Sequence, residues 1–179
     1  MRTVRFIDTV VCFLRDRKGV ACVEFVLILP LLVIFLFGTI EIGRALHDYH
    51  VVVKGVRDGT RYLSRVSVDC PGGIGTVGSI VNAPTDHELR GKNLTMTGLI
   101  NPTLPADYLL AAWGDPGTTL TVRVDCNDPA TLEGIYSGDP VVPSVTMTAV
   151  VKFDFLGSLP LLPNTINFTV SHKEISIGE

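Results

Sequence analysis

Hydrophobic residues are concentrated in one block near the N-terminus. Thirteen of the sixteen residues 25–40 are apolar and none is charged, the exceptions being Pro30, Gly38 and Thr39. A helix in a soluble core has one apolar face, whereas this block is apolar on every face. As a helix, residues 20–40 would rise about 31 Å, close to the hydrocarbon thickness of a bilayer. The pattern therefore predicts a membrane-spanning helix.

A cleaved secretory signal is an alternative interpretation of this block. The best cleavage site is Gly43-Arg44-Ala45, which follows Glu41 and contains an arginine. Signal cleavage sites favour small residues instead. A secreted protein cut near Ala45 is therefore the less favoured reading.

Downstream of the block, residues 44–65 keep a helical period but become amphipathic. Apolar residues recur at steps of three, four and seven, with charged residues between them: Leu46, Tyr49, Val53, Val56 and Leu63. Gly55 and Gly59 would each weaken this helix by about 1 kcal/mol relative to alanine, but their spacing permits close approach of another backbone. We expect packing against the rest of the chain, with packing against other subunits as the alternative.

Beyond residue 65 the pattern changes to loops and strands. Ten of the eleven prolines follow Arg65, and residues 70–75 form a glycine-rich loop. Alternating apolar and polar positions predict three strands, at residues 120–126, 145–155 and 166–171. No long helical pattern separates them, which favours an antiparallel sheet. The expected fold class is therefore α+β, with the long N-terminal helix packed on a small antiparallel sheet.

Charge orients the chain across the membrane. Residues 1–19 carry a net charge of +3, whereas residues 44–179 contain ten basic and fourteen acidic residues. Short basic flanks stay on the cytoplasmic side, and the acidic remainder gives no support for nucleic-acid binding. The predicted segments are a cytoplasmic leader (1–19), a transmembrane helix (20–43), an amphipathic extension (44–65) and an extracytoplasmic β-rich domain (66–179).

Two of the four cysteines fall in the segment expected outside. Cys12 precedes the apolar block and Cys22 lies at its start, which leaves Cys70 and Cys126. Disulfides form in oxidising compartments outside the cytoplasm, so these two are a possible pair. Cys126 lies on the apolar side of its strand, which also fits a buried thiol.

Candidate residues for catalysis or metal binding are few. His47 and His50 share a helix face, but no second ligand cluster with zinc-like spacing accompanies them. Asp125, Asn127 and Asp128 lack the twelve-residue loop of a calcium site. The sequence has no nucleophile elbow, phosphate-binding loop or dinucleotide fingerprint. We therefore expect no enzyme activity, no cofactor and no metal.

Glu24 is the one charge near the start of the apolar segment. A carboxylate there costs on the order of 2.5 kcal/mol or more unless it is paired or near the interface. It lies close enough to the helix end to reach the cytoplasmic head groups. Alternatively, cleavage after Gly19 would create an amine on Val20, four residues earlier and on the same helix face. The carboxylate could neutralise that amine or the amine of a neighbouring copy.

A basic leader ends in Gly19 and is followed by Glu24 at the fifth position, Phe25 at the sixth, and a long apolar helix. This combination resembles the TadE-like pseudopilins of the tight-adherence (Flp) branch of type IV pili. It covers roughly residues 14–65, through the runs Arg17–Phe25, Leu29–Leu32, Phe37–Ala45 and Val56–Tyr62. The combination is far more specific than any single part.

The resemblance implies a pilin-like fold and cleavage after Gly19 by a prepilin peptidase, with Glu24 guiding processing or assembly. Phe25 replaces the tyrosine common in major pilins, and Pro30 is expected to kink the helix. More than a hundred residues follow the helix, which fits a minor pilin or pseudopilin.

The implied partners are the peptidase, other pilins, inner-membrane pilus assembly proteins and the lipid bilayer. The implied location is the bacterial inner membrane, with the C-terminal domain in the periplasm. The alternative function is an uncleaved single-pass anchor that presents a binding domain.

Overall fold

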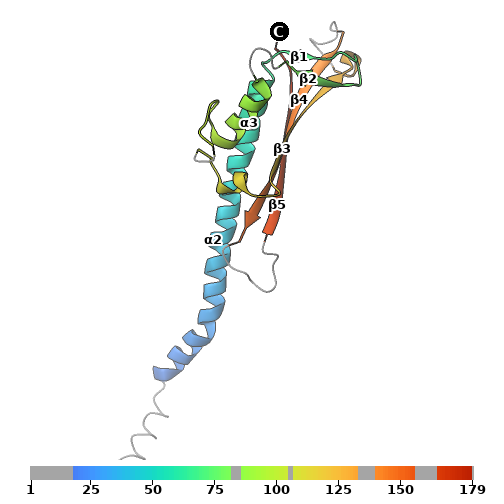
Figure 1. Ribbon diagram of the computed structural model, residues 1–179. Coiled ribbons are helices and arrows are strands. Elements are labelled where there is room, and N and C mark those ends of the chain that lie inside the picture. The colour runs from blue at the N-terminus through green and yellow to red at the C-terminus, as the bar shows by residue number, and fades with distance from the viewer. Residues whose placement is uncertain (1–17, 82–85, 105–106, 133–139, 156–164, 179) are drawn as a thin grey trace, which may run out of the picture. The chain divides into compact units, whose positions relative to one another are not determined.

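The computed structural model describes residues 18–81, 86–104, 107–132, 140–155 and 165–178 (Figure 1). Most of the expected leader and the apolar segment 156–164 lie outside the described residues. The chain divides into two compact units, Met1–Gly43 and Arg44–Glu179.

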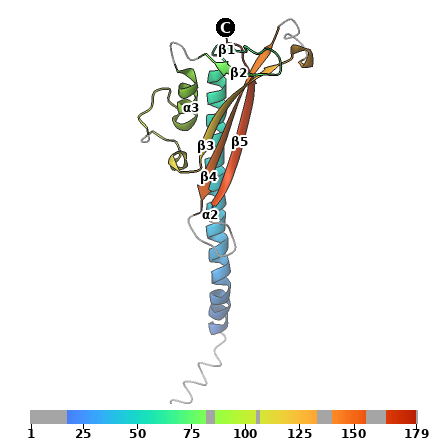
Figure 2. The same ribbon diagram turned by 45° about the vertical axis from the view of Figure 1, so that its right-hand side comes forward.

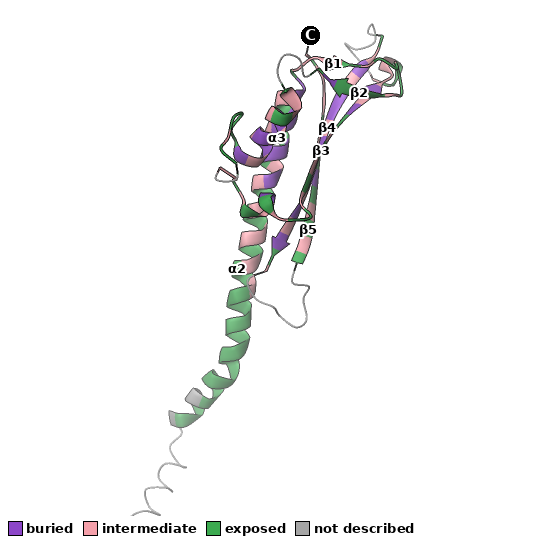
Figure 3. Ribbon diagram, in the orientation of Figure 1, coloured by how far each residue is buried: buried purple, intermediate pink, exposed green. Residues whose placement is uncertain are grey.

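All described residues of the first unit belong to helix α2 (Lys18–Leu63). Pro30 lies inside α2, and the residues on both sides of it are α-helical. Its segment Val23–Leu63 is long and apolar enough, by length and composition, to be a candidate membrane span, and no residue of its most apolar window is buried. Figure 3 shows these turns coloured as exposed. An exposed apolar surface of this length is expected of a helix whose solvent is lipid.

The second unit contains a five-stranded antiparallel sheet, in the order β1-β2-β3-β4-β5. The expected α+β class, a long helix with an antiparallel sheet, is confirmed. Three strands correspond to the predicted ones, whereas the two short strands were not predicted from the sequence. The bounds are β1 Val68–Asp69, β2 Val77–Ile80, β3 Thr119–Asn127, β4 Val142–Asp154 and β5 Thr165–Ile175.

Burial along β4 follows the alternation seen in its sequence. Val145, Met147 and Val151 are at most 2% exposed, while Thr146 and Lys152, which follow Val145 and Val151, are half-buried. Successive side chains of a strand point to opposite faces, so one face of β4 forms the core.

The C-terminal part of α2 packs on that apolar face of the sheet. Val52, Val56 and Leu63 are completely buried and belong to the same cluster as Val145 and Met147. Figures 1 and 2 show α2 and α3 (His87–Thr97) on the same side of the sheet. The core thus lies between one helical layer and one sheet layer.

Helix α3 was not predicted from the sequence. Its buried residues include polar and small ones, among them Gly91, Asn93 and Thr95, so it has no apolar stripe. It is defined instead by its ends: the Asp86 side chain accepts a hydrogen bond from the Leu89 N–H (2.9 Å), and Gly98 adopts a left-handed conformation with φ 73°. These are standard start and stop signals of a helix.

Candidate functional site

The expected processing site lies in the first turn of α2. The bounds of α2 start at Lys18, so the Gly19–Val20 bond follows the second residue of the helix. The first amides of a helix have no intrahelical acceptor. No acidic side chain lies in this turn.

Glu24 lies one turn beyond Val20 on a fully exposed section of α2. Val20 is 56% exposed and Phe25 57% exposed, and Glu24 is exposed between them. No other described residue makes a hydrogen bond or ion pair with Glu24. Four residues rise about 6 Å, and side chains at this spacing share a helix face. The structure thus places Gly19, Val20, Glu24 and Phe25 within two adjacent turns.

Gly55 and Gly59 have a different role, because they lie against α3. A Cβ added to Gly55 would collide with the carbonyl oxygen of Thr95, and one on Gly59 would collide with the Thr95 hydroxyl. Thr95 is 1% exposed, and its hydroxyl donates to the Gly91 carbonyl (2.9 Å). A missing side chain on α2 therefore permits close packing of two helices within the second unit. This agrees with the expectation that the glycines pack against the rest of the chain.

The C-terminal end of α2 is held by β5 and the residues that follow it. The Ile177 N–H donates to the Ser64 carbonyl (2.7 Å), and the Ser64 hydroxyl donates to Glu174 Oε2 (3.2 Å). Arg61 Nε and His172 Nε2 lie 3.7 and 3.1 Å from Glu174 Oε1. The last carbonyls of a helix lack intrahelical donors, and the tail supplies one. We call Ser64, Glu174 and Ile177 the C-terminal clamp.

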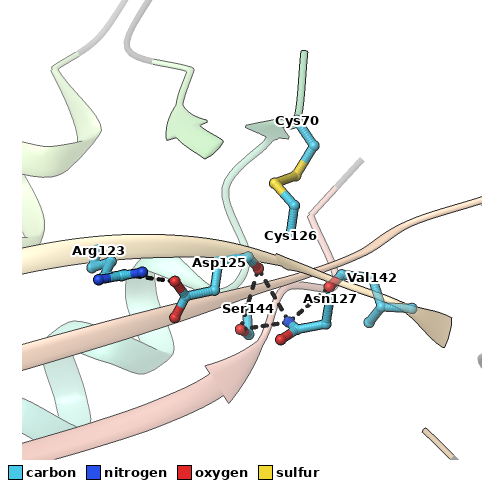
Figure 4. A network of polar contacts seen from close by, with 7 residues as sticks. All are labelled: Cys70, Arg123, Asp125, Cys126, Asn127, Val142 and Ser144. Carbon is cyan, nitrogen blue, oxygen red and sulfur yellow. Dashed lines mark hydrogen bonds and ion pairs between the residues drawn. A yellow bond between two sulfur atoms is a disulfide. The ribbon is translucent and has the colours of Figure 1, made fainter. Parts of the chain in front are cut away.

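Cys70 and Cys126 are joined in the structure, with an S–S distance of 2.02 Å and a Cα–Cα distance of 6.1 Å (Figure 4). Cys126 is 2% exposed on the inner face of β3, and Cys70 follows β1. The bond ties the short strands β1 and β2 to the main sheet. The pairing of two-residue strands is weak alone, so the disulfide helps to keep β1 and β2 attached to the sheet.

A polar network lies beside the disulfide on the outer face of the sheet (Figure 4). Asn127 Nδ2 contacts three acceptors on β3 and β4: the carbonyls of Asp125 (3.1 Å) and Val142 (2.9 Å), and the Ser144 hydroxyl (2.8 Å). Arg123 Nε donates to Asp125 Oδ1 (2.6 Å). Ser144 is only 1% exposed, yet its hydroxyl is paired. These partly buried hydrogen bonds join β3 to β4 and favour their register.

A cavity of about 380 Å³ opens next to this network. Its lining mixes cationic Arg123 and Lys173 with anionic Asp125 and Asp128. Two of these charges already pair with each other, since Arg123 contacts Asp125. The arrangement shows no preference for one sign of ligand.

The histidines take structural positions. His47 and His50 are exposed on α2, His87 Nδ1 lies 3.0 Å from the Tyr62 hydroxyl, and His172 contacts Glu174. Among the residues that the structure describes, no group of three or more histidine, cysteine, aspartate or glutamate side chains could hold a metal ion.

Sequence reasoning missed the α3 partner of the glycines and the C-terminal clamp. The run from Asp86 to Gly98 has a cap residue at its start and a glycine at its end, and this signal could have revealed α3. The clamp joins residues 110 or more apart, and a single sequence contains no signal for such a pairing.

The chain matches no curated protein and no solved structure. The N-terminal helix does match a family model, and the match ends close to the point where α2 ends at Leu63. Residues 19–61 match the family of TadE-like proteins, which confirms the resemblance carried by the Gly19–Glu24–Phe25 motif and the helix that follows it.

Proposed function

We propose that this protein is a minor pilin or pseudopilin that contributes to assembly of a tight-adherence pilus. In this proposal a prepilin peptidase cleaves after Gly19, and the mature chain packs through the helix that starts at Val20. The protein acts structurally rather than as an enzyme. The support is the TadE-like match over residues 19–61 together with the exposed apolar helix.

One observation carries the proposal: Glu24 is a lone exposed carboxylate in a helix whose neighbouring side chains are apolar and exposed. In lipid or in a helical bundle, such a carboxylate is costly without a positive partner. Cleavage after Gly19 would supply one, because it leaves an amine on Val20 at the positive end of the helix dipole. That amine is itself unfavourable there, so pairing with Glu24 of the same or a neighbouring copy relieves both charges.

The proposed location follows from the leader and the span. The basic leader stays in the cytoplasm, the apolar part of α2 lies in the inner membrane, and the second unit lies in the periplasm. The partners are the prepilin peptidase, which meets the leader on the cytoplasmic side, and other pilins and inner-membrane assembly proteins, which contact the exposed helix.

Two measurements test this function. Mass spectrometry of the membrane-associated protein from cells with an active peptidase should show Val20 as the first residue, and a Gly19→Leu variant should keep its leader. The Glu24→Gln variant should insert normally but assemble fewer pili, counted by electron microscopy. Asp48→Asn, a carboxylate change on the same helix outside the runs that carry the resemblance, is the matched control and should assemble as the wild type does.

An intact N-terminus in wild-type cells would contradict cleavage. Normal piliation by Glu24→Gln would contradict the role of the carboxylate even if cleavage occurs.

A second function is favoured by the start of α2 at Lys18. The Gly19–Val20 bond lies inside a helical turn, and a peptidase must unwind that turn to reach it. An uncleaved single-pass anchor that presents the second unit as a binding domain needs no such step. The same mass measurement separates the two functions, because the anchor retains the leader.

A further inference from the structure

A row of exposed cations follows one side of α2 within the second unit. Lys54, Arg57 and Arg61 are exposed and lie three and four residues apart, and Arg65 is exposed in the turn after the helix. Residues at this spacing share a helix face, and the seven residues from Lys54 to Arg61 span about 10 Å of helix. We call Lys54, Arg57, Arg61 and Arg65 the basic stripe.

The other side of the same helix is occupied by packing within the second unit. Val52 and Val56 are completely buried in the core, and Gly55 and Gly59 lie against Thr95 of α3. The basic stripe lies on the side of α2 that this packing leaves exposed. Packing in the core therefore does not explain the stripe.

Pairing within the second unit neutralises only one end of the basic stripe. Arg61 Nε lies 3.7 Å from Glu174 Oε1, and the Arg61 side chain is 63% exposed. Across the described ranges, Lys54 and Arg57 form no ion pair, even though the half-buried Asp58 is close in sequence. A helix face that only contacts water usually alternates positive and negative residues. Like charges at these spacings repel each other.

The helix dipole explains part of the stripe. Positive side chains are favourable in the last turn of a helix, and Arg61 lies in the last turn of α2, which ends at Leu63. Lys54 and Arg57 lie more than one turn before that end, where the effect of the dipole has faded. These two cations therefore lack an explanation within the second unit.

The rest of the second unit carries the opposite charge. Outside the basic stripe, residues 44–179 contain fourteen acidic and six basic residues, a net charge of −8. Asp69 and Asp86 are exposed, and neither pairs with a cation in the part of the chain that the structure describes. Surfaces of opposite charge favour association. A second copy of this chain thus offers the charge that the basic stripe lacks.

We propose that the basic stripe binds the acidic surface of a second copy of this chain. Two basic stripes repel, so the contact joins different surfaces on the two copies. Such a contact leaves one stripe and one acidic surface unoccupied, and it can continue from copy to copy as an open chain. The proposal rests on the proposed function and adds a surface of the second unit that joins neighbouring copies.

The test is sedimentation velocity of the full-length protein in a nonionic detergent. The wild type should associate at about 0.1 M salt and dissociate at about 1 M salt, because the Debye length falls from about 10 Å to about 3 Å. The variant Lys54→Glu, Arg57→Glu should associate roughly tenfold more weakly at the lower salt concentration, because like charges would then face each other. Both side chains are exposed, and an unchanged thermal unfolding midpoint would verify the fold.

The matched control is the variant Lys152→Glu, Lys173→Glu, which changes the net charge by the same amount outside the basic stripe. Lys152 forms a surface ion pair with Asp154 (3.1 Å), and such pairs contribute little to stability. This variant should associate at least as strongly as the wild type, because its acidic surface gains negative charge. An equal loss of association in both variants would overturn the role of the stripe and assign the effect to net charge.

Mixing the two proteins tests whether the contact joins different surfaces. The variant Lys54→Glu, Arg57→Glu keeps its acidic surface, so it should bind the free stripe of a wild-type chain and end the assembly there. An excess of unlabelled variant should therefore lower the sedimentation coefficient of fluorescently labelled wild type at about 0.1 M salt. An unchanged sedimentation coefficient would overturn the contact between stripe and acidic surface.

Two further outcomes would overturn the proposal. A wild type that stays monomeric at both salt concentrations has no such contact, and binding of duplex DNA through Lys54 and Arg57 would then assign the stripe to a nucleic acid. Association that resists both salt and the stripe variant would place self-association on another surface. Neither outcome decides the proposed function, because cleavage after Gly19 and the role of Glu24 are measured separately by mass and by pilus number.

Discussion

Single residues of α2 depart from its apolar pattern or from good helix formers for different physical reasons. Glu24 places a charge in an apolar surface. In lipid, the free-energy cost of this charge is offset only if a positive group pairs with it. Gly55 and Gly59 remove side chains so that Thr95 can approach. In the proposed function, the partner of Glu24 is a neighbouring copy or the terminus left by cleavage, whereas the glycines are explained by packing within the second unit.

Gly59→Ala tests the second reason. The added methyl would collide with the Thr95 hydroxyl and lies close to the Gly91 carbonyl and the Met147 Cε, so overpacking should lower the free energy of unfolding by about 1–3 kcal/mol. Gly43→Ala is the matched control, because no atom lies within 4 Å of a Cβ there. It should leave the stability unchanged or raise it by up to about 1 kcal/mol through helix propensity.

Thermal unfolding of the full chain in detergent measures both variants. Equal midpoints for Gly59→Ala and Gly43→Ala would show that the close approach of α3 has no energetic consequence.

For single residues, the sequence predicted that another segment packs closely against α2, but it did not predict which residue does so. The four-residue spacing of Gly55 and Gly59 indicated that a backbone comes close. It could not name Thr95, because α3 has polar buried residues and lacks the stripe on which pattern analysis depends. Glu24 was recognisable because a charge in an apolar run is a strong local signal.

The disulfide acts at the scale of elements, where it joins Cys70 after β1 to Cys126 in β3. For the sequence separation of 56, the chain-entropy model gives a stabilisation of about 4 kcal/mol. The double variant Cys70→Ser, Cys126→Ser should lose about this amount in denaturant unfolding.

Non-reducing peptide mapping should recover one linked peptide from the exported wild type. The variant Cys12→Ser, Cys22→Ser should keep that peptide and unfold as the wild type does. Free thiols at both Cys70 and Cys126 in protein from the membrane fraction would contradict the bond.

The C-terminal clamp predicts that the backbone of Ile177 matters and its side chain does not. Truncation after Ser176 removes the N–H that donates to Ser64 (2.7 Å) and should lower the free energy of unfolding by about 1 kcal/mol, the net value of one such hydrogen bond. Ile177→Ala keeps that N–H, and the side chain is 67% exposed, so its effect should stay within about 0.5 kcal/mol. A larger loss in Ile177→Ala than in the truncation would show that the side chain, and not the backbone bond, holds the helix end.

Among the elements, length and alternation decided what could be predicted. β3, β4 and β5 have nine, thirteen and eleven residues, and the alternation is clearest in β4, where Val145, Met147 and Val151 are buried. β1 and β2 have two and four residues, too few for a periodic signal. The Val68↔Ile80 pairing and the disulfide hold these two strands at the edge of the sheet. Both contacts join residues that are distant in sequence, so a local pattern does not reveal them.

For the molecule as a whole, orientation in the membrane depends on charge at the two ends of the span. Leader residues Arg15, Arg17 and Lys18 lie just before it, and positive charge close to a span is retained in the cytoplasm. The second unit also carries basic residues near the span, including Lys54 and Arg57. The proposed orientation therefore requires the leader to outweigh them.

The effect of these charges on orientation can be measured with a phosphatase that is active only outside the cytoplasm and is fused after Glu179. The wild-type fusion should be active. Replacing Arg15, Arg17 and Lys18 by glutamine should lower the activity at equal protein level, because the charge difference across the span shrinks. Replacing the same number of exposed cations beyond the span, Lys54, Arg57 and Arg65, should preserve or raise it. Both variants lose three positive charges, so opposite changes in phosphatase activity are expected only if the leader is held in the cytoplasm. A loss of activity in both variants would indicate misfolding of the fusion. Unchanged activity in the leader variant would show that the leader's charge does not determine the orientation.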